Sequence, residues 1–135
     1  MLKRLIEFVK NNKESLMIFI ISLLIYLSLQ LRSVYGGDSG DFAAAASVWG
    51  IPHPPGYPLY TILAGILSNF FSFSTTAYRI AFLSSIPAAL AVFFFYKLLN
   101  LYISKKTSLL SALFLAFSYP FWLYSEVVEV FALNS

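Results

Sequence analysis

Two aspartates in a polar segment of this otherwise apolar sequence have a spacing that could support chemistry. Asp38 and Asp41 lie three residues apart within Gly-Gly-Asp-Ser-Gly-Asp, directly after the first long apolar stretch. A carboxylate at such a place can act as a general base, or bind a cation or an ammonium group. A structural role is the alternative, because Asp38 or Ser39 can cap a helix whose first turn holds Asp41. Spacing alone leaves both roles open.

His53 is the one histidine of the sequence and stands in the proline-rich segment His-Pro-Pro-Gly-Tyr-Pro. Its imidazole can donate a hydrogen bond to a phosphate or a hydroxyl, or simply pack within the turn. With a single histidine and no cysteine, a divalent metal has little support, and no cofactor is expected. Arg32 and Arg79 can bind phosphate through their guanidinium groups, or lie at a membrane surface without a specific partner.

The composition indicates a membrane protein. Of 135 residues, 59% are hydrophobic and only 11% are charged, whereas soluble domains carry about a quarter charged residues. A chain with so few polar groups cannot cover its surface with them, so lipid must cover part of it. The basic residues form small clusters beside the apolar stretches, which argues against nucleic-acid binding. We therefore expect an all-α membrane protein with several transmembrane helices.

Three spans are expected, at about residues 15–35, 79–103 and 107–124, with an outer loop of juxtamembrane helices over residues 36–78. The apolar run Pro58–Phe73 is not counted as a span because it is short. As a helix it would reach roughly 24 Å, against a bilayer core of about 30 Å. A four-span arrangement, in which this run also crosses the membrane, is the alternative.

The distribution of basic residues favours three spans with a cytoplasmic N-terminus. This arrangement leaves Arg32 and Arg79 outside and puts seven basic residues in the cytoplasm, namely Lys3, Arg4, Lys10, Lys13, Lys97, Lys105 and Lys106. Four spans would divide the same residues five to four, which fits the positive-inside rule poorly. Only three spans place all of the later ionisable candidates on one side: Asp38, Asp41, His53, Glu126 and Glu129. A cleaved signal peptide competes for the first stretch, which is long for that role.

Three motifs, in order along nearly the whole chain, resemble the amino-terminal part of GT-C-type membrane glycosyltransferases. They stand at Gly36–Asp41, at Pro52–Leu59, and at Glu129–Asn134, where the sequence is Glu-Val-Phe-Ala-Leu-Asn. The resemblance is strongest to a bacterial family related to the eukaryotic transmembrane protein O-mannosyltransferase. Asp41 departs from that family's pattern, in which Glu is common. On this resemblance the chain is an amino-terminal fragment of a multi-pass enzyme of the bacterial inner membrane.

The resemblance implies that a sugar, mannose, is moved from a polyprenyl-phosphate donor to a protein hydroxyl on the outer, periplasmic face. Asp38 matches the acid that acts as general base on the acceptor, and Asp41 is the second choice for this role. Glu129 matches a second catalytic acid. A leaving lipid phosphate also needs positive partners. The substrate-binding candidates are His53, Tyr57, Arg32, Arg79, Glu126 and Asn134.

Two other functions remain open from the sequence. A transporter or channel subunit would line an ion path with the acidic residues, but it would place ionisable residues inside its spans. The expected spans hold only Lys97, close to a helix end. A non-catalytic membrane scaffold is the third hypothesis, and it gains weight if 135 residues are the whole protein.

Overall fold

The computed structural model describes residues 12–134, and these form helices and connecting segments with no β-strand among them. The basic residues Lys3, Arg4 and Lys10 lie outside the described residues. In chain order the helices are α2 (Lys13–Leu29), α3 (Ser39–Ser47), α4 (Pro58–Phe70), α5 (Thr76–Ile80), α6 (Phe82–Leu99), α7 (Lys105–Ala116), α8 (Tyr119–Glu126) and the 3-10 helix η1 (Phe131–Asn134). The prediction of an all-α fold is confirmed for this part of the chain.

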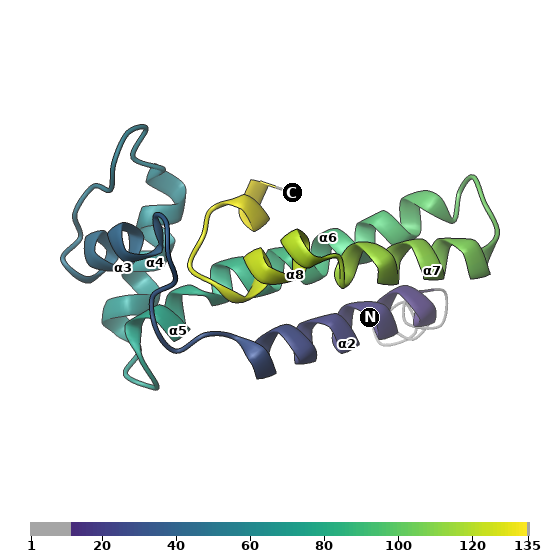
Figure 1. The fold of residues 1–135 in the computed structure, drawn as a ribbon, viewed down its shortest axis with the longest axis horizontal. Helices are drawn as coiled ribbons and strands as arrows, with labels where there is room; N and C mark the ends of the chain where they lie inside the picture. Colours follow the sequence, from purple (N-terminus) through teal and green to yellow (C-terminus); the bar gives the residue numbers. More distant parts are fainter. Residues whose placement is uncertain (1–11, 135) are drawn as a thin grey trace, which may run out of the picture.

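Four helices lie along the long axis of the molecule, and the three helices α3, α4 and α5 gather at one end (Figure 1). Helices α2, α7 and α8 run toward that end, and α6 runs away from it. The segment that follows α8 therefore leaves the bundle where the connection from α2 to α3 also leaves it. There, Val128 and Val130 pack in one apolar cluster with Phe42 and Tyr60.

Small side chains bring the long helices close together. One cluster joins α2, α6 and α7 through Ile18, Val92, Tyr96, Ala112 and Ala116, and a second joins α2, α6 and η1 through Tyr26, Ala88, Ala89 and Ala132. Alanine at a helix contact lets the backbones approach closely, which favours association where the surroundings are as apolar as the side chains. The bundle therefore depends on close packing.

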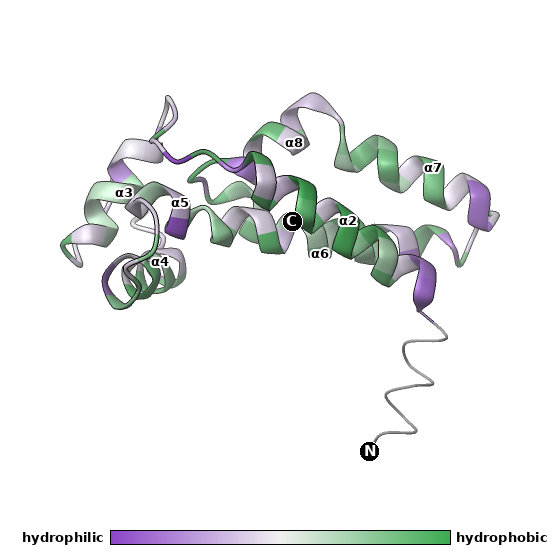
Figure 2. Cartoon of the chain, turned by 90° about the horizontal axis from the view of Figure 1, so that it is seen from below, coloured by the Kyte–Doolittle hydropathy of each residue, from purple (hydrophilic) through white to green (hydrophobic). Residues whose placement is uncertain are grey.

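The bundle helices are apolar over most of their length, and their hydrophilic residues lie toward the ends (Figure 2). By length and composition, one described stretch is able to cross a membrane, Thr76–Leu99, which joins α5 and α6. A second qualifies if α7 and α8, which are bent by 59° at their junction, count as one. Helix α2 has 17 described residues and α4 has 13. The presence of several transmembrane spans therefore stays a proposal.

The span predicted over residues 107–124 is broken between α7 and α8. Pro120, at the start of α8, has no N–H with which to continue the helical bond to the carbonyl of Ala116. The hydroxyl of Tyr26, a fully buried residue of α2, donates to that carbonyl at 2.9 Å. A side chain of α2 thus supplies the hydrogen bond that the proline removes from α7.

We expect Tyr26→Phe to lower the free energy of unfolding by about 1 to 3 kcal/mol, because it removes the donor to a buried carbonyl and little else. Denaturant unfolding of the detergent-solubilised protein measures the change. Tyr102→Phe is the matched control, because the Tyr102 side chain is 78% exposed and its hydroxyl should not affect stability. Equal stability of the two variants would contradict this role of Tyr26.

Candidate functional site

Polar side chains from three parts of the chain meet around His53 at the end of the bundle. His53 belongs to the loop between α3 and α4, and Asp38 and Asp41 come from the start of α3. Glu129 lies on the segment between α8 and η1, close enough for its charge to act on His53. We call these four residues the His53 cluster.

Asp41 fixes the imidazole of His53 through one carboxylate oxygen. Its Oδ2 accepts the backbone N–H of His53 at 2.8 Å and lies 2.7 Å from Nδ1. An ionised carboxylate only accepts hydrogen bonds, so Nδ1 carries the proton in this contact. The backbone N–H, and then the imidazole, lower the pKa of Asp41. The hydrogen bond to Asp41 in turn raises the pKa of His53.

Asp38 faces the other nitrogen of the same imidazole. It stands at the N-cap position of α3, where its carbonyl accepts the N–H of Phe42 at 3.0 Å, but its carboxylate caps no N–H of this described helix. Instead its Oδ2 lies 3.5 Å from Nε2 of His53. The Asp38 side chain is 58% exposed, so a substrate could reach this carboxylate.

Aromatic rings hold the imidazole in place. The ring centroids of Phe42 and Tyr57 lie 5.5 Å and 5.8 Å from that of His53, and 5.4 Å from each other. Tyr57 has a φ of 42°, a left-handed conformation that is uncommon for a tyrosine. This conformation turns the chain into α4. The ring distance shows that Tyr57, a predicted substrate-binding residue, packs against His53.

Ser84 of α6 fixes the position of Glu129. Its hydroxyl donates to the Glu129 carbonyl at 3.0 Å and lies 3.4 Å from the Glu129 N–H. The glutamate is 5% exposed, and its Oε1 packs toward Gly37, where an added Cβ would lie 3.8 Å away. Burial raises the pKa of the Glu129 carboxyl, and the neighbouring charge of Asp38 raises it further.

Tyr60 of α4 is a buried neighbour of Glu129. Burial raises the pKa of its phenol, and the charge of Glu129 adds to this effect. Within residues 12–134, the Tyr60 hydroxyl and Oε2 of Glu129 are buried atoms without a hydrogen-bond partner. Buried polar atoms usually have a partner, so these two groups have unused capacity to bind hydroxyls of a ligand.

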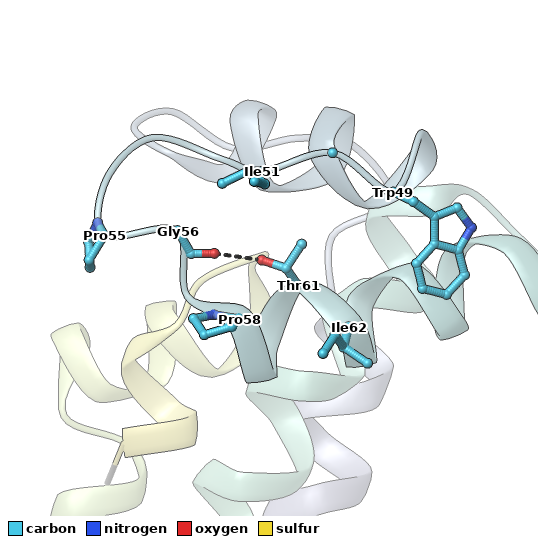
Figure 3. A pocket seen from close by; sticks show the side chains of 8 residues that line it. Trp49, Ile51, Pro55, Gly56, Pro58, Thr61 and Ile62 are labelled. Atoms are coloured by element: carbon cyan, nitrogen blue, oxygen red, sulfur yellow. Dashed lines mark hydrogen bonds between the residues drawn. The ribbon is translucent and has the colours of Figure 1, made fainter.

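An apolar pocket of about 370 Å³ borders the loop that carries His53. Figure 3 shows Trp49 and Ile51 of this loop, and Pro58 and Ile62 of α4, around the pocket. The hydroxyl of Thr61 donates to the carbonyl of Gly56 at 2.9 Å and ties the loop to the first turn of α4. One loop therefore adjoins both the polar cluster and an apolar surface.

Glu126 does not share a helix face with Glu129, although residues three apart on one helix would do so. Helix α8 ends at Glu126, and the next residue is extended. The buried Glu126 side chain faces Trp122 of its own helix and Tyr26 of α2. Glu126 thus belongs to the bundle and not to the His53 cluster. Asn134 ends η1, and its side chain lies outside the described part of the structure.

Arg79 is not available to a phosphate, so that expectation is wrong. The residue is 8% exposed, and a guanidinium group has five N–H donors. All five are used, by the carbonyls of Leu67, Ser68, Phe73 and Ser74 and by the hydroxyl of Thr76. Arg79 therefore ties the end of α4 to the loop before α5.

Arg32 remains open to a ligand. Its side chain is exposed, and its guanidinium carbon lies 6.0 Å from the ring centroid of Tyr78. A guanidinium that lies over an aromatic face keeps its N–H donors available at its edge. The hydroxyl of Thr75 donates to the Arg32 carbonyl and fixes the backbone there. Of the two predicted phosphate partners, Arg32 is thus the one that can serve.

Among the described residues, no group of three or more His, Cys, Asp or Glu side chains is arranged to hold a metal ion. The His53 cluster instead pairs its acids with an imidazole, and its chemistry is that of proton transfer and hydrogen bonding.

Comparison with known proteins places the chain in a family. A family model described as "Protein O-mannosyl-transferase TMEM260 N-terminal domain" matches residues 38–135, which include the whole His53 cluster. The chain belongs to the TMEM260 family. Protein O-mannosyl-transferase tmem260 of Dictyostelium discoideum is 38% identical over 122 residues, which cover 88% of this chain and 15% of that protein. No solved structure matches the chain.

The TMEM260 protein of Mus musculus is similar as well, with 41% identity over 105 residues, or 77% of this chain and 15% of the mouse protein. The chain thus spans about 15% of the length of either relative. Both relatives are eukaryotic, so the comparisons support the O-mannosyl-transferase family predicted from the motifs but give no support to its bacterial branch.

Sequence reasoning missed two residues of the site in this TMEM260 family member. Tyr60 lies three residues after Tyr57, a spacing that puts both on one face of a helix. Ser84 stands beside Ser85 in a mostly apolar helix, and small hydroxyl residues in such helices often bond to neighbouring segments. Both patterns are visible in the sequence, but neither shows which residue Tyr60 or Ser84 contacts.

We expect Arg79→Lys to lower the free energy of unfolding by at least about 2 kcal/mol, because lysine cannot satisfy the same acceptors from one ammonium group. Arg32→Lys is the matched control and should leave stability unchanged, since Arg32 is exposed. Unfolding in detergent compares the two. If Arg79→Lys is as stable as Arg32→Lys, the five bonds of Arg79 do not stabilise the fold.

Proposed function

We propose that this chain is part of a GT-C-type membrane glycosyltransferase that moves mannose from a polyprenyl-phosphate donor to a hydroxyl of a protein. Membership of the TMEM260 family supports protein O-mannosylation, since the relatives carry that name. The observation that carries the proposal is the His53 cluster, in which an exposed aspartate, an imidazole and a buried glutamate meet at the end of an apolar bundle.

Asp38 is the general base in this proposal. As the acceptor hydroxyl attacks the anomeric carbon of the sugar, its proton passes to the Asp38 carboxylate. The bond between the anomeric carbon and the phosphate oxygen breaks, and its electron pair leaves with the lipid phosphate. The exposure of Asp38 supports this role, because an acceptor protein must reach the base from outside.

Glu129 and Tyr60 bind the hydroxyl groups of the sugar. Each has a buried polar atom without a described partner, and a ligand that pairs with both would relieve the cost of leaving them unpaired. The raised pKa of Glu129 lets its carboxyl donate as well as accept a hydrogen bond over a wider pH range.

Arg32 pairs with the leaving phosphate, and lipid covers the apolar surfaces near the loop. A guanidinium stabilises the negative charge that develops on a phosphate oxygen. The apolar pocket beside the loop offers a surface for the first isoprene units of the donor. Both contacts lie on the side of the bundle that holds α3, α4 and α5.

This end of the bundle lies on the non-cytoplasmic side of a membrane in the proposed arrangement. Helices α2 and α6, and the bent pair α7 and α8, are the three spans, while α3 and α4 lie at the surface. The direction of the helices in Figure 1 supports this, because it returns Glu129 to the end that carries Asp38. The seven-to-two division of basic residues supports a cytoplasmic N-terminus.

We expect Asp38→Asn to lower kcat for sugar transfer by about 10²- to 10⁴-fold, the usual contribution of a general base. Transfer of labelled mannose to an acceptor protein in membranes that contain the full-length protein measures this. Glu14→Gln is the control, because Glu14 bonds Tyr96 and Lys105 at the opposite end of the bundle. Unchanged turnover in Asp38→Asn would remove Asp38 as the base.

The proposed topology can be tested with single cysteines, since the sequence has no cysteine of its own. Ser72 and Lys106 are both exposed and lie at opposite ends of α6. We expect a membrane-impermeant thiol reagent, applied from the non-cytoplasmic side, to label Ser72→Cys in sealed vesicles. Lys106→Cys should react only after the membrane is opened. The reverse pattern would support four spans and contradict the proposed sidedness.

A further inference from the structure

The two aspartates of the His53 cluster differ in how they contact the imidazole, although they are the same residue type three positions apart. Asp41 makes two close contacts with His53, to the backbone N–H and to Nδ1, at 2.8 Å and 2.7 Å. Asp38 makes one longer contact, 3.5 Å to Nε2. An aspartate that already accepts two hydrogen bonds is a poor base for a substrate, but it orients the ring to which it is bound.

We propose that Asp41 and His53 form a proton relay behind Asp38, in which Asp41 holds the imidazole and Nε2 of His53 receives the proton that Asp38 takes from the acceptor. This inference rests on the proposed transferase function. Asp41 is then a positioning residue rather than a second base. His53 acts on the proton after transfer, and not as a donor to phosphate.

The relay balances one proton for each sugar transferred. The proton moves from the acceptor hydroxyl to Oδ2 of Asp38, and from there to the lone pair of Nε2, while Nδ1 keeps its own proton on Asp41. The resulting imidazolium releases the proton from Nε2 to solvent, which reaches the ring because the His53 side chain is 36% exposed. Asp38 is ionised again and ready for the next acceptor.

The pH dependence follows from the groups that face the imidazole. These are Asp38 and Asp41 of α3, Glu129 after α8, and the phenol of Tyr57 at the start of α4. Only neutral His53 can accept a proton, so activity should fall as the pH drops through the pKa of His53. Asp41 raises that pKa. Asp41→Asn keeps the shape but removes the charge, so it should move the acidic limb of the kcat profile to lower pH.

His53→Asn separates the relay from a structural role of the ring. Its amide can still donate to Asp41 in place of Nδ1, but it has no group in the position of Nε2. In the full-length protein we expect kcat to fall by about 10²-fold or more, with KM little changed. We also expect added imidazole to restore part of the activity of His53→Ala, and the acidic limb assigned to His53 to be absent from His53→Asn.

A His53→Asn variant with the kcat and pH profile of the natural protein would overturn the relay. Loss of the fold in that variant leaves the decision to Asp41→Asn, where an unmoved acidic limb would equally overturn it. Asp38→Asn distinguishes a failure of the relay from a failure of the proposed function. If Asp38→Asn is inactive and His53→Asn is active, the transferase stands without the relay. If Asp38→Asn is also active, the proposed base itself is lost.

Discussion

The segment that carries Glu129 crosses buried, apolar surroundings outside any helix, and hydroxyl groups of α6 stabilise it. Chain outside a helix lacks the hydrogen bonds of the helix, and an unpaired buried peptide group is costly. Ser84 contacts both the carbonyl and the N–H of Glu129. Ser85 lies 2.8 Å from the Ser125 carbonyl and 2.7 Å from Oε1 of Gln30. One turn of α6 thus joins the ends of α2 and α8 to the site.

Three acids can gather at this place because their environments differ. Asp41 is stabilised as an anion by its contacts with His53, whereas burial and Asp38 favour the neutral form of Glu129. His53 holds its proton more readily because acids surround it. From Phe42 to Tyr78 the sequence contains no Lys, Arg, Asp or Glu, so the imidazole is the main counter-charge that this part of the chain supplies.

The sequence was informative where charge and position follow from simple rules. Charge counting predicted that Asp38, Asp41, His53 and Glu129 would share one side of a membrane, and the structure brings them to one end of the bundle. The length of Pro58–Phe73 predicted a helix too short to be a span, and α4 has 13 residues; its place at a membrane surface stays a prediction. The role of Arg79 could not be predicted, because its five acceptors are mostly backbone carbonyls, which leave no mark on residue types.

Two further differences have local causes in the backbone. Glu126 and Glu129 are three residues apart, which on one helix would put them on one face, but α8 ends at Glu126. Residues 107–124 were expected to form one span, whereas Pro120 lies at the start of a new helix within that stretch. The point at which a helix ends depends on tertiary hydrogen bonds, such as the one from the Tyr26 hydroxyl to the Ala116 carbonyl. Residue types alone do not reveal such bonds.

The segment between α8 and η1 also fixes how many residues separate α8 from the site. It is extended at Val127 and bends at Val128 and Val130. Val127 and Val128, each 1% exposed, fill the space between Glu126 and Glu129. One residue more or fewer would move Glu129 out of the position in which Ser84 contacts its backbone, and a buried valine would take that position. The number of residues between the end of α8 and Glu129 therefore constrains the site as much as the residue type at position 129 does.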